Sequence, residues 1–164
     1  MNPSVQPGLI LVTAAVAEVR EGMREIAIAV DRRTLAKRLW RGTAEDGVEF
    51  GFELQKRLTH GAIAHQANQS CYVLRQHPEP CLVVPFENLP PSAVAGISWA
   101  VGNLHLEFSS DLERMVTPDE PAARRLLERL GITFQTQTLV FRAGHFKRHA
   151  AAPQELGTSH RHDL

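Results

Sequence analysis

The chain has 164 residues, of which 43% are hydrophobic and 22% charged, as expected for a soluble protein of one ordinary domain or two small ones. Its 18 basic and 18 acidic residues give a net charge of zero, and only 6% of its residues are aromatic. These values argue against a general nucleic-acid binder, which needs excess positive charge and aromatic rings for stacking. The apolar run 9–17 is too short to cross a membrane, and no membrane association is expected.

The first 76 residues are predicted to form an all-β domain of short strands. Asp31 can cap a short helical turn, and Asp46-Gly47 between two alternating runs predicts a β-hairpin. Apolar, β-branched or alternating runs predict strands at 9–19, 24–30, 35–41, 48–54, 62–66 and 70–75.

A basic run lies within this β domain. It has two interpretations: a solvated strand edge that resists aggregation, or a docking site for an acidic partner protein. Its members are Arg32, Arg33, Lys37, Arg38 and Arg41.

A proline-containing linker, 77–80, precedes a second predicted domain at 81–145. Its first strand, 81–86, is apolar on both faces, as a central strand would be. Helices are predicted from Pro90-Pro91 to Gly102-Asn103, and from a Thr117 cap with Pro118 and Glu120 to Gly131. Strands at 104–108, 113–116 and 132–141 complete the βαββαβ order of a ferredoxin-like domain.

The predicted fold class is therefore α+β, with an all-β domain, a ferredoxin-like domain and a tail. The tail, 146–164, lacks an apolar period and is expected to be disordered. In a ferredoxin-like domain both helices cover one sheet face. Because strand 81–86 is apolar on both sides, a second copy of the chain is expected to cover the other face, giving a homodimer.

Cysteine and histidine usage narrows the chemistry. Cys71 and Cys81 form no Cys-x-x-Cys pair, so no zinc ribbon or thioredoxin-type motif is present, and a reducing, cytoplasmic compartment is expected. Histidine is the unusual residue: five of the eight lie beyond residue 104. These five are His105, His145, His149, His160 and His162.

His105 is the first candidate metal ligand. The alternation of 104–108 predicts that it lies on the polar face of a strand, where hydrogen bonding to Glu107 is the simplest role. If the open sheet face is the dimer interface, two copies of His105 would meet near the two-fold axis. The tail adds His160 and His162, and imidazole suits Ni, Cu and Zn. Such an exposed, incompletely ligated site is suited to passing metal on.

The remaining histidines have weaker claims. His145 and His149 have the i, i+4 spacing of a helical metal site, but the composition around them disfavours a helix, so a solvated role is preferred. His60, His65 and His77 lie on predicted turns or strands of the first domain and need no ligand role. No Ser/His/Asp order, phosphate loop or paired carboxylates mark an enzyme.

Several short motifs, in order along the chain, resemble the family of UreE nickel metallochaperones, the urease accessory proteins. Gly102-Asn103-Leu104-His105 together with the histidine-containing tail is the most specific of them. The others are Lys37–Phe52, Leu126–Gly131 and Phe141-Arg142-Ala143-Gly144.

This resemblance implies an N-terminal domain that contacts partners and a C-terminal domain that dimerises and binds metal through His105. It implies Ni(II) as cargo, with Zn(II) or Cu(II) as other metals for the same site. The implied partners are the urease apoprotein complex and its accessory GTPase. The tail has only His160 and His162 near its end, and no histidine pair occurs around 117–120, so one transfer site per dimer is expected rather than a nickel store.

Two other classes remain open. One is a protein-interaction module or folding helper with incidental histidines, which metal titration would separate from a nickel carrier. The other is a ferredoxin-like RNA binder, which the zero net charge and the Glu-Arg-Met-Val strand at 113–116 disfavour.

Overall fold

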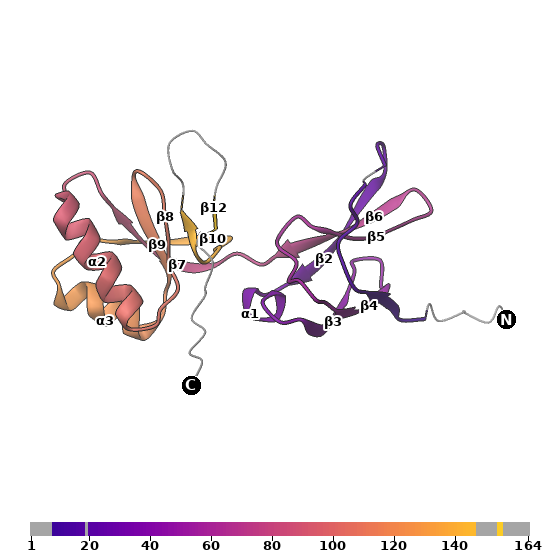
Figure 1. Cartoon of the computed structure of the whole chain (residues 1–164), viewed down its shortest axis with the longest axis horizontal. Coiled ribbons are helices and arrows are strands. Elements are labelled where there is room, and N and C mark those ends of the chain that lie inside the picture. Colours follow the sequence, from indigo (N-terminus) through magenta and orange to yellow (C-terminus); the bar gives the residue numbers. More distant parts are fainter. Residues whose placement is uncertain (1–7, 19, 147–153, 156–164) are drawn as a thin grey trace. The chain divides into compact units, whose positions relative to one another are not determined.

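The computed structural model describes residues 8–18, 20–146 and 154–155, and the chain divides into two compact units, Met1–His77 and Pro78–Leu164 (Figure 1). Each unit has its own sheets and its own apolar core. The structure is mixed α+β, with many short strands and few helices, in agreement with the predicted fold class. No helix of the described residues has both the length and the apolar character that a membrane crossing requires.

The described residues of the first unit form two three-stranded sheets and one short helix. In the first sheet β4 is central, pairing in parallel with β1 and antiparallel with β3; in the second, β6 lies between β2 and β5. The elements are β1 (Ile10–Val12), β2 (Arg24–Val30), α1 (Arg32–Leu35), β3 (Leu39–Thr43), β4 (Glu49–Glu53), β5 (Ile63–Ala67) and β6 (Ser70–Gln76).

The core of this unit follows from alternation along the strands. Phe50 and Phe52 are fully buried on one face of β4, and the Trp40 ring stacks on Phe52 with centroids 3.7 Å apart. Ile28 and Leu74, both fully buried, belong to the same cluster. The residues of β3 and β4 that alternate with Trp40, Phe50 and Phe52 therefore point to the outer side of the sheet.

Two local predictions in this unit are confirmed. The Asp46-Gly47 turn joins β3 and β4 as an antiparallel hairpin, with Gly47 at a positive φ of 87°. The Asp31 carboxylate caps α1 by accepting a 2.9 Å hydrogen bond from the Thr34 amide, and hydrogen bonding to Thr34 lowers the pKa of Asp31. The strand predicted at 35–41 starts later, at Leu39, because α1 takes up the beginning of that run.

The single tyrosine of the chain links the two sheets. Tyr72 donates a 2.9 Å hydrogen bond to the Asp46 carboxylate, and burial, then that bond, raises the pKa of the Tyr72 phenol above 10.0. The neutral phenol is thus favoured in the folded state. The neutral phenol therefore contributes its full stabilisation of the fold below the pKa that Tyr72 has in the unfolded chain. This contribution is lost as the pH rises through the higher pKa that Tyr72 has in the folded protein.

We expect the ultraviolet absorbance of tyrosinate to appear at higher pH in the folded protein than in denaturant. Tyr72→Phe should lower the free energy of unfolding by about 1 kcal/mol at neutral pH, since it removes one hydrogen bond and leaves Asp46 with solvent. Identical titration curves in the folded and denatured protein would contradict this assignment.

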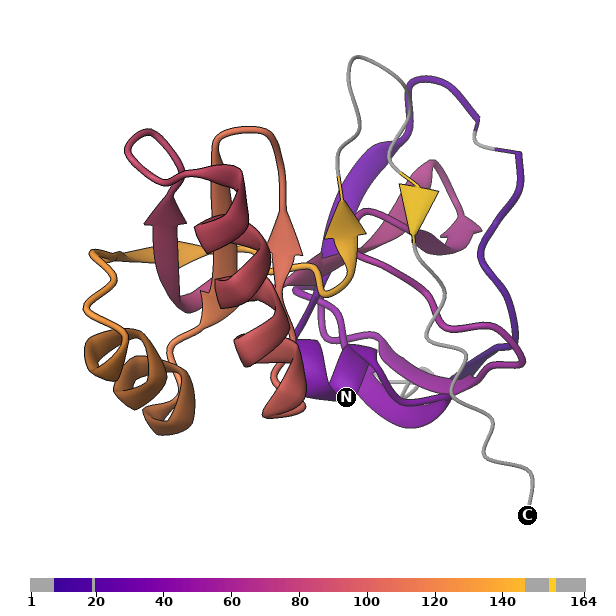
Figure 2. The ribbon, with the colours of Figure 1, turned by 60° about the vertical axis from the view of Figure 1, so that its left-hand side comes forward.

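The described residues of the second unit form one sheet of order β10-β7-β9-β8-β11-β12. The pairs β10-β7, β7-β9 and β9-β8 are antiparallel, whereas β8 and β11 are parallel. Helices α2 and α3 both lie on one side of this sheet (Figure 2). The elements are β7 (Glu79–Pro85), α2 (Pro91–Asn103), β8 (Ser109–Ser110), β9 (Arg114–Pro118), α3 (Pro121–Arg129), β10 (Gln135–Leu139), β11 (His145–Phe146) and β12 (Gln154–Glu155).

Strand β7 is buried on both faces, as its apolar sequence predicts. Leu82 and Val84 pack under the helices, while Cys81 and Val83 face the other way. On that second side they contact Phe141, which is only 2% exposed. The chain therefore covers this face with its own segment after β10. The expectation that a second copy is needed to bury this face of β7 is therefore wrong.

The predicted start of the second helix is also wrong. Thr117 lies in β9, fully buried, and its hydroxyl donates a 2.8 Å hydrogen bond to the Glu107 carbonyl. Pro118 pairs with Cys81 in the sheet, so strand pairing overrides the local capping signature. The helix instead begins at Pro121, which offers the same proline start three residues later. Its predicted end is confirmed, since Gly131 has a left-handed φ of 65°.

Candidate metal centre

His105 lies in a tight turn at the end of α2, not on a strand. The helix ends at Asn103, and the next strand, β8, begins only at Ser109. The prediction of a strand at 104–108 is therefore wrong. The alternating leucines that suggested it belong to a helix-capping turn, in which Leu106 is partly buried against the core and Leu104 is 44% exposed.

The backbone hydrogen bonds define this turn. The His105 amide donates to the Gly102 carbonyl at 2.9 Å, and the Leu106 amide donates to the Val101 carbonyl at 3.3 Å. These two bonds form a Schellman motif, with His105 at the first position beyond the helix cap. Leu106 and Val101 join the same apolar cluster, as is usual for this motif.

His105 adopts a left-handed φ of 56° at a position where glycine is the usual residue. A side chain with a Cβ is less stable there than glycine, by up to about 1 kcal/mol. The imidazole is exposed, so no buried contact offsets that cost. A strained residue that stability does not explain is a candidate for function. The backbone of this turn places the imidazole at the surface, at the end of α2.

The beginning of the tail lies beside this turn. The Gly144 amide donates a 2.9 Å hydrogen bond to the carbonyl of Phe108, three residues after His105. Strand β11 then pairs in parallel with β8, with Phe146 opposite Ser110. His145 is in β11, whereas His149, His160 and His162 lie outside the described residues. The residues that lead into the tail are thus hydrogen-bonded to the segment that directly follows the His105 turn.

Two histidines of the first unit have structural roles, as expected. His60 Nδ1 accepts a 3.0 Å hydrogen bond from the Gln76 amide. The His65 ring lies 6.0 Å from the Tyr72 ring and 6.2 Å from the Phe50 ring, centroid to centroid. In the part of the chain that the structure describes, no three His, Cys, Asp or Glu residues gather as a metal-binding group.

An apolar surface that the sequence reading missed adjoins His105. Trp99 is 71% exposed on the side of α2 that faces away from the sheet, and Leu104 follows at the end of the helix. The signal was present in the sequence, because Trp99 lies off the stripe of Val94, Ile97 and Val101 that forms the buried face. We call Trp99 and Leu104 the α2 surface.

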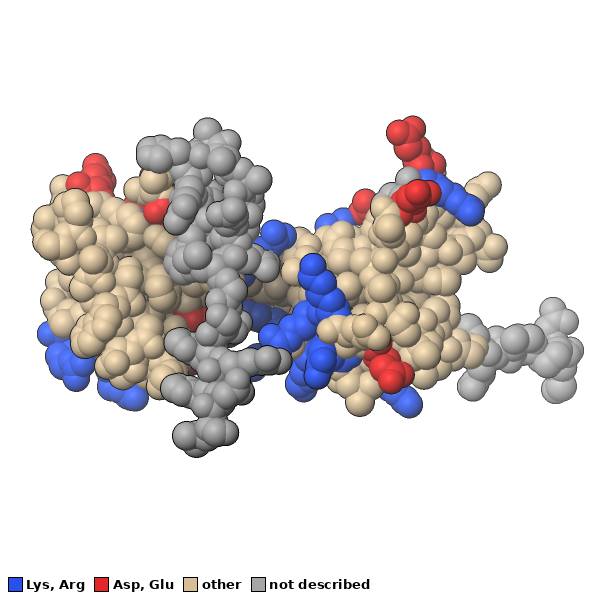
Figure 3. Space-filling model, in the orientation of Figure 1, with Lys and Arg blue, Asp and Glu red and all other residues tan. Residues whose placement is uncertain are grey.

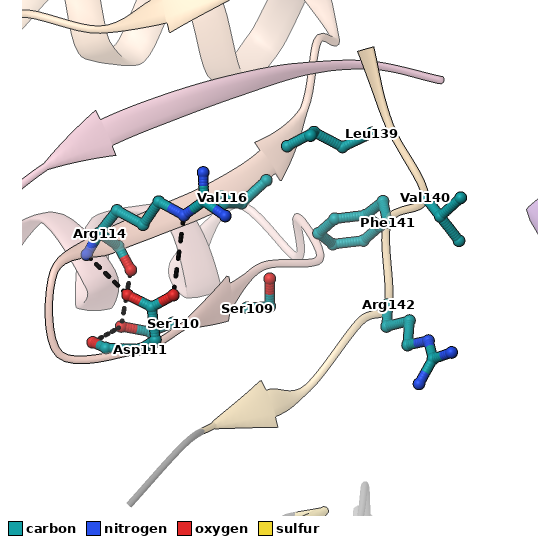
Figure 4. A pocket seen from close by; sticks show the side chains of 9 residues that line it. All are labelled: Ser109, Ser110, Asp111, Arg114, Val116, Leu139, Val140, Phe141 and Arg142. Carbon is teal, nitrogen blue, oxygen red and sulfur yellow. Dashed lines mark hydrogen bonds and ion pairs between the residues drawn. The ribbon is translucent and has the colours of Figure 1, made fainter. Parts of the chain in front are cut away.

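A pocket of about 250 Å³ lies between the β8–β9 turn and residues 139–142 (Figure 4). Three of its polar residues, Ser110, Asp111 and Arg114, are already engaged in the turn. The Asp111 carboxylate accepts from the amides of Glu113 and Arg114 at 2.9 Å each and lies 3.6 Å from the Arg114 guanidinium. The Ser110 hydroxyl donates within the same turn. These groups hold the hairpin and are not arranged around a ligand.

Two comparisons with known proteins agree with each other. The family described as UreE urease accessory protein, C-terminal domain, matches residues 79–163. The urease accessory protein UreE of Deinococcus radiodurans is 35% identical over 115 residues, which make up 69% of this chain and 71% of that protein. The match at 79–163 includes α2, the His105 turn and the tail. The chain belongs to the UreE family of urease accessory proteins, so it has a role in urease maturation and is not itself an enzyme.

Proposed function

We propose that the chain is a nickel metallochaperone that delivers Ni(II) to the urease apoprotein during urease maturation. The observation that carries this proposal is His105, an exposed imidazole held at a left-handed position where glycine would be more stable. Imidazole nitrogen is a good ligand for Ni(II), and also for Zn(II) and Cu(II). An exposed site at a helix end gives a metal an open path to an acceptor protein.

The other ligands are proposed to come from the tail and from a second copy of the chain. His160 and His162 follow a segment whose base is bonded next to the His105 turn through Gly144 and Phe108. A second copy would add a second His105 at a two-fold axis. One such shared site per dimer has few fixed ligands, and metal held in this way can be passed on.

We propose that the homodimer forms through the α2 surface. An exposed tryptophan and leucine at one helix end are typical of the centre of an interface. His105 follows Leu104 directly, so pairing of the two α2 surfaces across a two-fold axis would bring the two histidines together. The same geometry explains why α2 is apolar nearly all round and has no charged residue.

We further infer that residues 81–145 form a ferredoxin-like metal-binding and dimerisation domain. The strand order β10-β7-β9-β8, all antiparallel, with both helices on one side, supports this. In the same proposal, residues 1–76 form a domain for partner contacts, 77–80 a linker and 146–164 the tail. The partners are the urease apoprotein complex and its accessory GTPase, in the cytoplasm.

The experiment that tests this function is transfer. Purified chain loaded with Ni(II) should activate urease apoprotein when chelators hold free nickel too low to do so, and urease activity is the readout. The apo chain should not activate under those conditions. If loaded and apo chain gave the same activity, delivery by this protein would be excluded.

The contribution of the tail can be measured separately. Deleting residues 156–164 removes His160 and His162 but leaves β11 and β12 in place. We expect isothermal titration to show weaker Ni(II) binding or a lower stoichiometry, with unchanged circular dichroism. The double substitution His160→Asn and His162→Asn is the matched control and should give the same loss. Full-strength binding in both variants would show that these two histidines are not ligands.

A further inference from the structure

The outer face of the sheet β1-β4-β3 is an exposed apolar surface with a basic border. Leu9, Leu11 and Leu39 are 44%, 61% and 75% exposed. Strand pairing places Leu11, Gly51 and Arg41 in one row across the sheet, with all three on the side away from the core. Three solvent-exposed leucine side chains on one sheet face form an apolar surface of a kind that often marks an interaction site.

The leucines of β1 are held against the sheet. A Cβ at residue 51 would lie 3.1 Å from Leu9 Cδ2 and 3.8 Å from Leu11 Cδ1, so these side chains lie over the bare glycine. Gly51 is buried by them although it is on the outer face. A surface already ordered in this way loses little conformational entropy when a partner binds.

Positive charge lies along one side of this face. Lys37, Arg38 and Arg41 are exposed around Leu39, and Lys and Arg side chains gather over α1 and the start of β3 (Figure 3). An apolar centre with an arginine border is the usual anatomy of a protein interface. The border would attract carboxylates and orient them before contact.

We infer that this face docks an acidic protein segment that also carries apolar side chains. Carboxylates of the partner would meet Arg38 and Arg41, while its apolar side chains would pack on Leu39 and Leu11. The inference rests on the part of the proposed function that gives partner contacts to the first unit. It is independent of nickel binding, which is assigned to the second unit.

Acidic side chains on the same face decide against extended polyanions. Glu53 is paired with Leu39 and Glu49 with Thr43, so both glutamates share the outer side with Arg41. Nucleic acid or an anionic lipid surface laid across the sheet would meet these glutamates together with the arginines. A protein with a local acidic patch limits that repulsion by placing its carboxylates at the β3 edge, next to Arg41, and away from the glutamates of β4.

The test uses the full chain and a fluorescein-labelled synthetic peptide that has glutamates in one half and leucines in the other, and binding is followed by fluorescence anisotropy. The double variant Arg38→Glu, Arg41→Glu should bind about tenfold more weakly or worse, and Leu39→Ser about fivefold more weakly. The matched control, Arg20→Glu with Arg24→Glu, makes the same charge change at exposed residues outside this sheet and should alter affinity less than about twofold.

The outcomes separate this inference from the proposed function. Nickel titration should be unchanged in all three variants, so lost peptide binding with intact nickel binding supports the docking face. Equal losses in the border variant and the control would overturn it, as would no saturable signal up to about 1 mM peptide. Tighter binding of duplex DNA or phosphatidylserine vesicles than of peptide, abolished by Arg38→Glu with Arg41→Glu, would also overturn it.

Discussion

His105→Gly should abolish tight nickel binding and make the protein slightly more stable. Glycine is the preferred residue at the left-handed position beyond the helix cap, so it relieves the cost that His105 bears at φ 56°. We expect the free energy of unfolding to rise by about 0.5–1 kcal/mol in the metal-free protein. At a symmetric site, one ligand lost per chain is two lost per dimer. Isothermal titration and chemical denaturation of the same samples measure both effects.

Two controls isolate the imidazole. His105→Asn keeps a residue that tolerates the left-handed conformation but lacks a ring nitrogen, and it should also lose nickel. His77→Asn removes another exposed histidine, in the first unit, and should bind nickel as the unaltered chain does. A folded His105→Gly dimer that still bound nickel tightly would falsify the ligand role of His105 and leave the tail as the site.

Local signals with a single physical solution were predictable from the sequence. Asp46-Gly47 specified its hairpin because the last residue of the tight loop 45–47 has a positive φ, which glycine adopts without strain. The run before Pro85 is apolar at successive positions, which point to opposite faces of a sheet. It therefore specified a central strand, because only a strand buried on both faces needs apolar side chains on both. Gly131 ended its helix, since its left-handed φ of 65° is natural for glycine.

Sequence patterns that fit two different local structures could not be assigned from the neighbouring residues alone. The alternation of Leu104, Leu106 and Phe108 fits both a strand and a capping turn, and only the backbone bonds from His105 and Leu106 to the helix distinguish them. For Thr117, the capping signature was real but the pairing of β9 with β7 outweighed it. Long-range pairing of this kind leaves no local trace in sequence.

The site was predicted in part. The exposure of His105 was predicted from the alternation of 104–108 and is confirmed, although the residue lies in a turn and not on a strand. Its strain is a property of that turn and became visible only in the backbone angles. His160 and His162 lie outside the described residues, so their ligand role stays a prediction. A second copy was expected over the side of the sheet away from the helices, because nothing in the apolar pattern of β7 indicated that Phe141 would cover it.

Substitutions at Trp99, on the α2 surface, and at Phe141, on the other side of the sheet, are expected to have opposite effects on dimerisation and on folding. If the α2 surface forms the dimer, removing its tryptophan should dissociate the dimer and leave each chain folded, since Trp99 is 71% exposed in a single chain. Phe141 is 2% exposed and packs on Cys81 and Val83, so its loss should instead destabilise the chain itself.

Trp99→Ser is therefore expected to raise the dimer dissociation constant by about 100-fold or more, because a buried aromatic side chain near a two-fold axis is lost twice. Sedimentation velocity over a concentration series measures this. Nickel stoichiometry should fall with the dimer, since the two copies of His105 would no longer meet. Phe141→Ala, the matched control, should lower the free energy of unfolding by about 3–5 kcal/mol through the cavity it leaves. At concentrations where it remains folded, it should still dimerise. A Trp99→Ser chain that sediments as a dimer, or a folded Phe141→Ala chain that sediments only as a monomer, would move the interface away from α2.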